Sequence, residues 1–153
     1  MTELDIQYVC ENELNREFRK EDLTIMCFNA WSLVNKMTEL ELYLRHLEQI
    51  GIIPDIICVS ETFLNEELLK TMYDLTNYNA YHYFRPTKRR GGGVSVYARE
   101  NLKTGHNIRL INHNEIQYLI LPIRDFNFEI CITYRPPTHS GSEIEKGGHF
   151  LKP

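Results

Sequence analysis

Three polar residues stand at the ends of apolar runs, and their side chains suit phosphate or metal chemistry. Asn29 follows the run at 23–28, Glu61 follows the run at 55–60, and Tyr134 closes the last long run. In a parallel α/β unit, the residues just beyond the strand ends share one edge of the sheet, and ligands bind there. We therefore expect the three side chains to converge on one rim.

The carboxylate of Glu61, supported by the amide of Asn29, is enough protein to begin a magnesium site. Mg²⁺ prefers oxygen ligands, keeps several waters and is usually held by one or two carboxylates plus substrate phosphate. A plainer interpretation is that Glu61 is the solvated end of a strand or belongs to the cap region of the next helix. Spacing alone favours this plainer interpretation without excluding the metal site.

A basic run followed by glycines forms a second candidate site. Arg85, Lys88, Arg89 and Arg90 precede the three glycines at 91–93. Cations supply sequence-independent attraction to nucleic acid, and glycine allows a close backbone approach. The segment is therefore a candidate nucleic-acid-binding loop. Charge runs more often form a solvated hairpin tip with a bulge, and four bases do not establish a nuclear address.

The histidines and cysteines show no spacing typical of a metal site. None of the six histidines is assigned a role. The four cysteines lack CxxC spacing and three of them lie in apolar runs, which predicts reduced core residues and no disulfide set. These are Cys10, Cys27, Cys58 and Cys131.

Apolar periodicity predicts a β-α-β unit followed by a series of strands. The first helix is expected to have Thr38 as its N-cap and Gly51 as its stop, and a second is expected over 65–75 with Asn65 as cap. The strand at 55–60 is apolar on both faces, as expected for a parallel strand covered by helices. Further strands are predicted at 78–84, 93–98, 107–111, 116–123 and 126–134, the last two joined as a hairpin by the turn "RDFN".

Length and charge fit one domain with polar ends. The chain has 153 residues and a formal charge of −4, all of it from seven acids and three bases in residues 1–22. We predict a polar leader at 1–22, the domain at 23–138, and a disordered or unrelated tail at 139–153. No run resembles a membrane span or a secretory signal, so we expect an intracellular protein of the nucleus or cytoplasm, not secreted and without a membrane partner.

Four motifs together resemble a known family. "FNAWSLVNK", "PDIICVSETFL", "FRPTKRRGGGVSVYAREN" and "ITYRPP" occur in the order and approximate spacing of the apurinic-type endonuclease domain of non-LTR (LINE-type) retrotransposons. This family lies within the endonuclease/exonuclease/phosphatase superfamily. The resemblance covers about residues 23–138.

The resemblance implies a fold, a reaction and a set of residues. The fold would be a DNase I-like four-layer α/β sandwich, and the activity Mg²⁺-dependent nicking of DNA, with Mn²⁺ as an alternative ion. By motif match, Asn29 would support the metal and its waters, Glu61 would be the metal ligand, and Tyr134 would contact the scissile phosphate region. The position of Trp31 is commonly an arginine in this family, so the rim is expected to contact its substrate differently here.

Two later motifs of the family are not found. Such domains continue past "YRPP" to a Gly-Asp-Phe-Asn motif and a Ser-Asp-His motif, which supply the remaining acid/base and orienting groups. "RDFN" at 124–127 mimics the first, but it precedes "YRPP" and sits where a hairpin turn is needed. "GGHF" has no Asp before His149. We therefore expect a partial sandwich without its C-terminal strands.

Three functional hypotheses follow. The first is a truncated retrotransposon-type endonuclease with weak or no activity, because losing several acid/base groups leaves little catalysis. The second is a non-enzymatic module that binds nucleic acid or protein, with self-association through an exposed sheet as a further expectation. The third, which the motifs favour least, is a phosphoinositide or sphingolipid phosphodiesterase of the same superfamily.

Overall fold

The structure is a computed structural model that describes residues 22–69, 73–84 and 91–137. The predicted tail and almost all of the predicted leader lie outside these residues. The strands are β1 Ile25–Asn29, β2 Ile56–Ser60, β3 Tyr78–Tyr83, β4 Val94–Arg99, β5 Arg109–His113, β6 Ile116–Ile123 and β7 Phe128–Tyr134. The helices are α1 Met37–Gln49 and α2 Glu66–Leu69, with short 3₁₀ turns η2 Leu33–Asn35 and η3 Arg124–Phe126.

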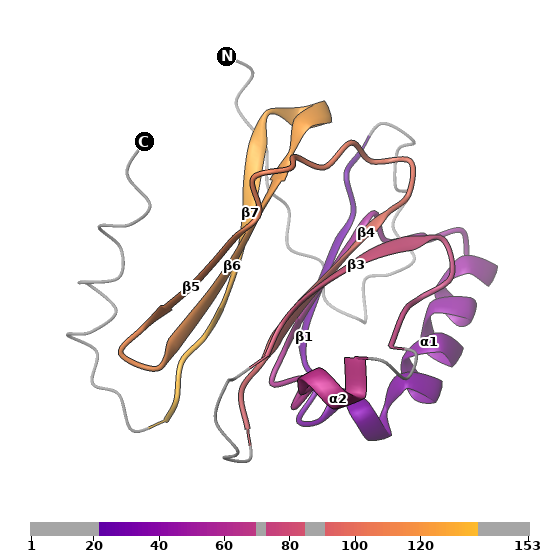
Figure 1. Cartoon of the computed structure of the whole chain (residues 1–153). Coiled ribbons are helices and arrows are strands. Elements are labelled where there is room, and N and C mark those ends of the chain that lie inside the picture. The colour runs from indigo at the N-terminus through magenta and orange to yellow at the C-terminus, as the bar shows by residue number, and fades with distance from the viewer. Residues whose placement is uncertain (1–21, 70–72, 85–90, 138–153) are drawn as a thin grey trace.

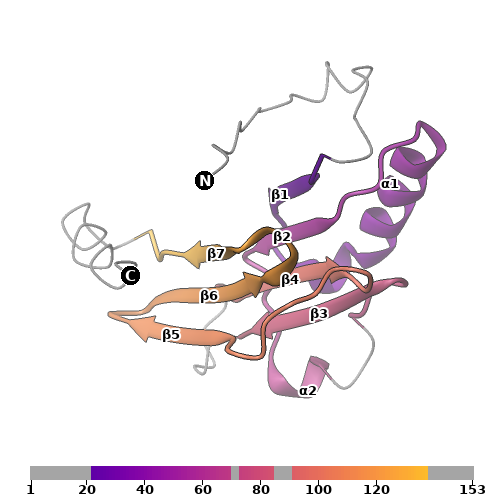
Figure 2. The same ribbon diagram turned by 90° about the horizontal axis from the view of Figure 1, so that it is seen from above.

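The strands form two sheets that pack face to face. Sheet A has the order β1-β2-β4-β3, with β1 and β2 parallel and the other pairs antiparallel. Sheet B is the antiparallel meander β5-β6-β7. Contacts of β7 with β2 and β4, and of β6 with β4 and β3, place sheet B over one face of sheet A. Helix α1 covers the other face of sheet A (Figures 1 and 2).

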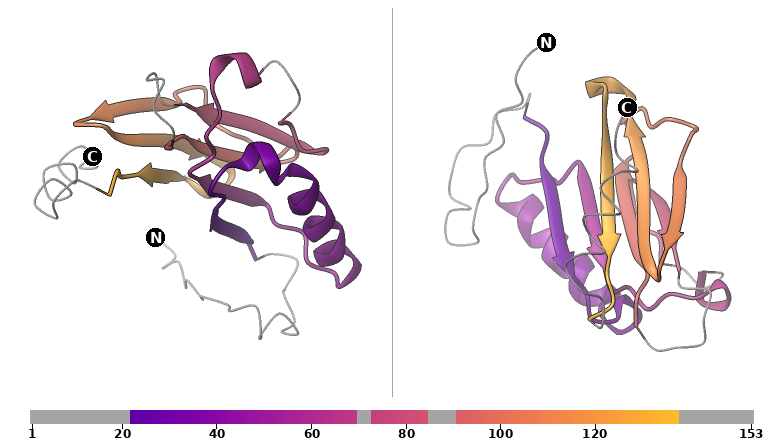
Figure 3. Two further views of the ribbon diagram at one scale, coloured as in Figure 1. Left: turned by 90° about the horizontal axis from the view of Figure 1, so that it is seen from below. Right: turned by 90° about the vertical axis from the view of Figure 1, so that its left-hand side faces the viewer.

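The described residues therefore form three layers of an α/β sandwich: helix, sheet A and sheet B. The predicted α/β class and partial sandwich are confirmed. Within the described ranges, the outer face of sheet B carries no helix (Figure 3). In the same ranges, no helix is long and apolar enough to cross a bilayer.

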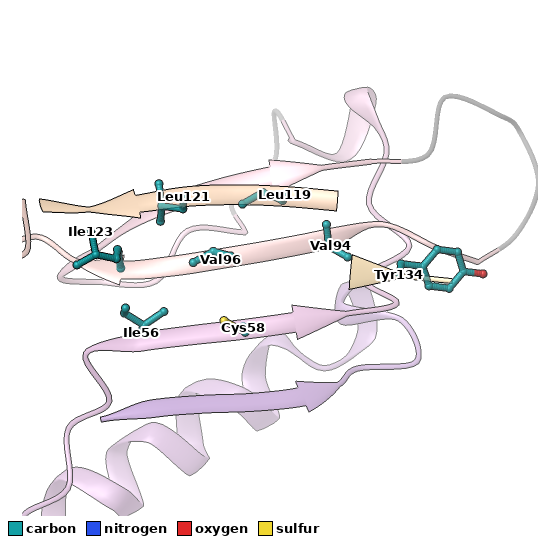
Figure 4. Packing of buried hydrophobic residues seen from close by; sticks show 9 residues of the cluster. Ile56, Cys58, Val94, Val96, Leu119, Leu121, Ile123 and Tyr134 are labelled. Atoms are coloured by element: carbon teal, nitrogen blue, oxygen red, sulfur yellow. The ribbon is translucent and has the colours of Figure 1, made fainter. Parts of the chain in front are cut away.

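The two faces of β2 are buried by different partners. Ile57 and Val59 pack with Leu40 of α1 in the cluster between sheet A and the helix. Ile56 and Cys58 pack with strands of sheet B in the cluster between the sheets (Figure 4). The prediction of burial on both faces is confirmed, but the expectation that helices cover both is wrong, since a second sheet covers one of them.

The predicted helices need correction at their ends. Helix α1 begins at Met37 with Lys36 in the N-cap position and no side-chain cap, so the assignment of Thr38 as N-cap is wrong. Gly51 follows the helix with φ 83°, which suits a glycine stop. Helix α2 covers Glu66–Leu69 in the described residues, and residues 73–75, the end of the predicted helix, are not helical. The cap role of Asn65 stays a prediction.

The strand and hairpin predictions hold. The five later strands lie where the apolar pattern predicts them, although β5 and β7 each begin two residues later than expected. The "RDFN" segment is a turn: η3 is followed by Asn127 with φ 54°, and β6 and β7 pair on either side of it. This segment is a hairpin connection, as expected.

The inner face of sheet A is covered unevenly. Ile56 on β2 is 0% exposed, whereas its register partner Ile25 on β1 is 42% exposed. The next pair along repeats the difference, because Cys58 is buried and Cys27 is exposed. The prediction of core cysteines is thus correct for Cys58 and wrong for Cys27 and Cys131, which are both exposed. Cys10 lies outside the described residues.

Candidate functional site

The carboxyl ends of β1 and β2 carry Asn29 and Glu61 to one end of the sandwich, here called the site end. The two strands are parallel, and Asn29 is the register partner of Ser60. The ladder continues beyond the strands, because the N–H of Ser32 donates to the carbonyl of Glu61 at 2.9 Å and that of Leu33 to Thr62 at 2.9 Å. These hydrogen bonds fix the backbone at Glu61 and in the turn that follows Asn29.

A glycine segment supports the backbone after Glu61. The N–H of Thr62 donates to Gly93 O at 3.2 Å, and that of Phe63 donates to Gly92 O at 3.0 Å. An added Cβ at Gly93 would lie only 2.5 Å from Thr62 Oγ1, and Gly93 has φ 83°. Both the close approach and the backbone angle therefore require glycine at this position.

The glycine segment is tied in turn to sheet B by Gln117. Gly93 N–H donates to Gln117 Oε1 at 2.8 Å. Gln117 is 0% exposed, and its Nε2 has no hydrogen-bond partner among the described residues. A buried side-chain amide whose nitrogen has no hydrogen-bond partner is uncommon and costs free energy, so Gln117 is an unusual residue of the core.

Tyr134 reaches the same end from sheet B. It is the register partner of Gln117, and the residue is 7% exposed. Its hydroxyl lies 3.7 Å from the position that a Cβ on Gly91 would occupy, and Phe63 lies 3.8 Å from that same position. Figure 4 shows the hydroxyl pointing beyond the carboxyl end of β2. The sheets thus bring Asn29, Glu61 and Tyr134 to one end of the molecule.

The surface beside Asn29 is aromatic. Asn29 Oδ1 accepts a hydrogen bond from Trp31 N–H at 2.9 Å, which holds the turn after β1. Trp31 is 68% exposed, and its ring lies 6.1 Å from that of Phe63. Trp31 and Phe63 form what we call the aromatic pair, an apolar surface next to both polar residues of sheet A.

The donor set at the site end suits a hard cation that keeps most of its waters. Among the described residues, no group of three or more His, Cys, Asp or Glu gathers as a closed metal site. One carboxylate, Glu61, and one amide, Asn29, instead stand on neighbouring strand ends. Mg²⁺ is commonly held by one or two carboxylates together with waters and phosphate oxygens, so these residues fit such an ion.

The structure also shows what the sequence analysis missed. Gln117 lies within the apolar strand β6, where the lone amide in "IQYLILPI" is a signal for a special position. Gly93 was assigned to a phosphate approach or a bulge, whereas it packs against Thr62. The predicted nucleic-acid-binding residues lie outside the described ranges, namely Arg85, Lys88, Arg89 and Arg90.

Comparison with known proteins bears on the fold. No family model and no curated protein matches the sequence. Among solved structures, TDP2 from Caenorhabditis elegans matches with a TM-score of 0.53 and 12% identity over 84% of this chain and 40% of that one. The AP endonuclease LMAP from Leishmania major matches with a TM-score of 0.51 and 14% identity over 94% and 53%. This chain has an endonuclease/exonuclease/phosphatase-like fold.

At these identities the likeness concerns the fold alone. The chain spans about half the length of the solved structures it matches, 40% of TDP2 and 53% of LMAP. The carboxyl ends of the parallel strands of sheet A and the end of β7 meet at one edge of the sandwich.

Proposed function

We propose that this chain carries part of a Mg²⁺-dependent phosphodiesterase site that acts on DNA, of the kind found in retrotransposon endonucleases. The observation that carries the proposal is the meeting of Asn29, Glu61 and Tyr134 at one end of the two sheets. The motifs around them, "FNAW", "SETF" and "TYRPP", are those through which the sequence resembles that family.

Glu61 and Asn29 would hold the ion. When bound, Mg²⁺ polarises a phosphoryl oxygen and stabilises negative charge on the leaving oxygen. The phenol of Tyr134, on a ring fixed by burial, donates a hydrogen bond to a non-bridging phosphate oxygen. Because the glycine segment and Gln117 hold the backbone after Glu61, we expect its carboxylate to be oriented before substrate binds.

The aromatic pair gives this site a second kind of contact. An exposed indole beside a phosphate site offers a face on which a base stacks, and such stacking is largely independent of sequence. Trp31 takes the place of an arginine that is common in the family, so stacking replaces part of the electrostatic attraction. The cations at 85–90 supply the rest through the phosphate backbone.

Catalysis by this chain alone is expected to be weak or absent. The Gly-Asp-Phe-Asn and Ser-Asp-His motifs, which the resemblance gives acid/base and orienting work, are not found in the sequence. Loss of one acid or base typically costs about 10²- to 10⁴-fold, so several losses leave little turnover.

Metal and DNA binding test the proposal without relying on turnover. Loss of the free Mn²⁺ electron paramagnetic resonance signal reports ion binding, and Trp31, the only tryptophan in the chain, reports DNA by fluorescence quenching. We expect the chain to bind Mn²⁺. We also expect a short oligonucleotide to quench Trp31 more strongly when a divalent ion is present. Glu61→Gln should weaken both effects at least tenfold. The matched control Glu129→Gln, an exposed carboxylate on the outer face of β7, should leave both unchanged.

Plasmid nicking completes the test. In Mg²⁺, the wild type should nick supercoiled plasmid slowly or not at all. If the site is a catalytic remnant, its nicking rate should not exceed that of Glu61→Gln. Ordinary enzyme rates that Glu61→Gln abolishes would refute the expectation of weak activity. Metal and DNA binding indifferent to Glu61→Gln would refute the proposed site.

A binding module without catalysis is the second candidate, favoured by the inner face of β1, which is exposed among the described residues. Ile25 is 42% exposed there, and such apolar surface recruits a partner or promotes self-association. This candidate predicts salt-dependent DNA binding that needs Arg89 and Arg90 and ignores Glu61→Gln. Light scattering over a concentration series tests self-association, which Ile25→Ser should reduce.

A further inference from the structure

The two cysteines of the parallel pair β1–β2 lie side by side. Cys27 and Cys58 are direct register partners, and partners in register place their side chains on the same face of the sheet. Adjacent strands are about 4.8 Å apart, within the Cα separation of about 4.4–6.8 Å that disulfides span. We propose that Cys27 and Cys58 are a dithiol modification site that small-molecule disulfides such as oxidised glutathione convert to an internal disulfide.

The two thiols differ in access. Cys58 is buried in the cluster between the sheets, with Ile56 and Val94, so a bulky oxidant cannot reach it first. Cys27 is exposed, because sheet B does not cover the inner face of β1. An oxidant therefore meets Cys27, and the neighbouring Cys58 is the group placed to resolve the product.

The chemistry balances in two exchanges. The Cys27 sulfur attacks oxidised glutathione, forms a mixed disulfide and releases one glutathione thiolate. The Cys58 sulfur then attacks Cys27 Sγ, forms the internal disulfide and releases the second glutathione. Together the two protein thiols lose two electrons and two protons, which the oxidant gains as two glutathione thiols.

The position gives the bond a structural effect. Cys27 lies two residues before Asn29 and on the same face of β1, and Cys58 lies three residues before Glu61. Side chains on parallel strands stand farther apart than the Cβ separation of about 3.8 Å that a relaxed disulfide prefers. The bond therefore draws the two strands together beneath the site end. This inference does not depend on the proposed phosphodiesterase function.

The experiment uses the full chain with Cys10→Ser and Cys131→Ser, which leaves only the pair. After treatment with oxidised glutathione, we expect the intact mass to fall by two hydrogens, and dithiothreitol to restore it. Trypsin cleaves after Lys36 and Arg45, between the cysteines, so the bond appears as two linked peptides. A stable glutathione adduct on Cys27 without the internal bond, or a disulfide-linked dimer, would overturn the proposal.

A second measurement probes the reduced pair directly. Phenylarsine oxide, a trivalent arsenical, binds tightly only where two thiols lie together. It should protect both thiols of the pair from Ellman's reagent at near-stoichiometric amounts. Cys27→Ser, at an exposed position that tolerates a polar side chain, should abolish protection. Equal protection with and without Cys27 would also overturn the proposal.

Discussion

The two ends of the sandwich differ in the types of residue that adopt positive φ. Outside the tight turn of the β5–β6 hairpin, four residues at the site end that are neither Gly nor Asn have positive φ: Trp31, Ser32, Glu61 and Phe63. At the opposite end, here called the far end, positive φ falls on Gly51, Asn77 and Asn127, residue types that tolerate it. Glu61 and its neighbours at the site end thus occupy costly conformations, whereas the positive φ angles of the described far end fall on residue types that tolerate them.

The polar groups show the same contrast. At the far end, Asp55 accepts a hydrogen bond from Thr24 N–H at 2.9 Å and pairs with Arg99 at 3.5 Å. At the site end, Gln117 leaves its Nε2 without a partner among the described residues. Strained backbone and unsatisfied buried groups persist where the surroundings over-determine them, often at functional sites. The difference fits the proposed binding role of the site end, which would be gained at some expense of stability.

The largest expected effect comes from Gly93→Ala. The new Cβ would lie 2.5 Å from Thr62 Oγ1 in a conformation with φ 83°, so clash and strain add to about 3 kcal/mol of lost unfolding free energy. Gly51→Ala is a matched control, because Gly51 also has φ 83° and no atom within 4 Å of its added Cβ. It should cost only about 1 kcal/mol. Urea unfolding measures both, and equal losses would show that the glycine segment is not tightly packed.

The next effect concerns Gln117. Gln117→Leu removes the acceptor of Gly93 N–H and leaves that donor buried, at an expected cost of about 2 kcal/mol. Because Gly93 supports the segment that contains Phe63, Trp31 fluorescence should also shift. At the far end, Tyr78→Phe removes the 2.6 Å hydrogen bond to Pro54 O, should cost about 1 kcal/mol, and should leave the emission unchanged. If the Trp31 emission did not change in Gln117→Leu, Gln117 would not support the structure of the site end.

The fold was largely predictable because the strands have clear apolar patterns in the sequence. In β2, "IICVS" is buried on both faces, and alternation in β7 separates inward Ile130 and Ile132 from outward Glu129. Local signals failed where long-range packing decides. No cap replaced Thr38 at α1, and exposure of Cys27 depends on which strands sheet B extends over.

The site was predictable only in part. Strand-end position indicated Asn29, Glu61 and Tyr134, since sheet topology carries such residues to one edge. Gln117 and Gly93 act through contacts between residues more than twenty positions apart, which no local pattern encodes. The positive φ of Glu61 was equally hidden, because glutamate itself gives no signal for it.

The pH dependence of stability tests the interior near the site end. Burial lowers the pKa of His82, whose Nδ1 lies 2.7 Å from Ser95 Oγ. The unfolded chain, with the ordinary pKa of about 6.5, therefore binds the proton more readily than the folded chain. The contribution of neutral His82 to the free energy of unfolding should be complete above pH 7 and should decrease as the pH drops through 6.5. Urea unfolding at pH 7.5 and 5.5 should show a smaller loss in His82→Gln; an equal loss would mean that His82 is not the cause.

The smallest effects are expected at the far-end turn, where Asp125 mimics a catalytic acid. Its Oδ2 accepts a hydrogen bond from Lys103 N–H at 2.8 Å, and its Oδ1 lies 4.0 Å from Lys103 Nζ. Asp125→Ala removes both interactions and should cost about 1 kcal/mol. Lys103→Ala removes only an ion pair whose lysine is 81% exposed, and should cost less than about 0.5 kcal/mol.

Neither variant should change Mn²⁺ binding or quenching of Trp31 by DNA, because the turn lies at the opposite end of β7 from Tyr134. If Asp125→Ala weakened metal binding as Glu61→Gln does, the two ends would not be functionally distinct. The contrast in backbone strain between the ends would then reflect packing alone.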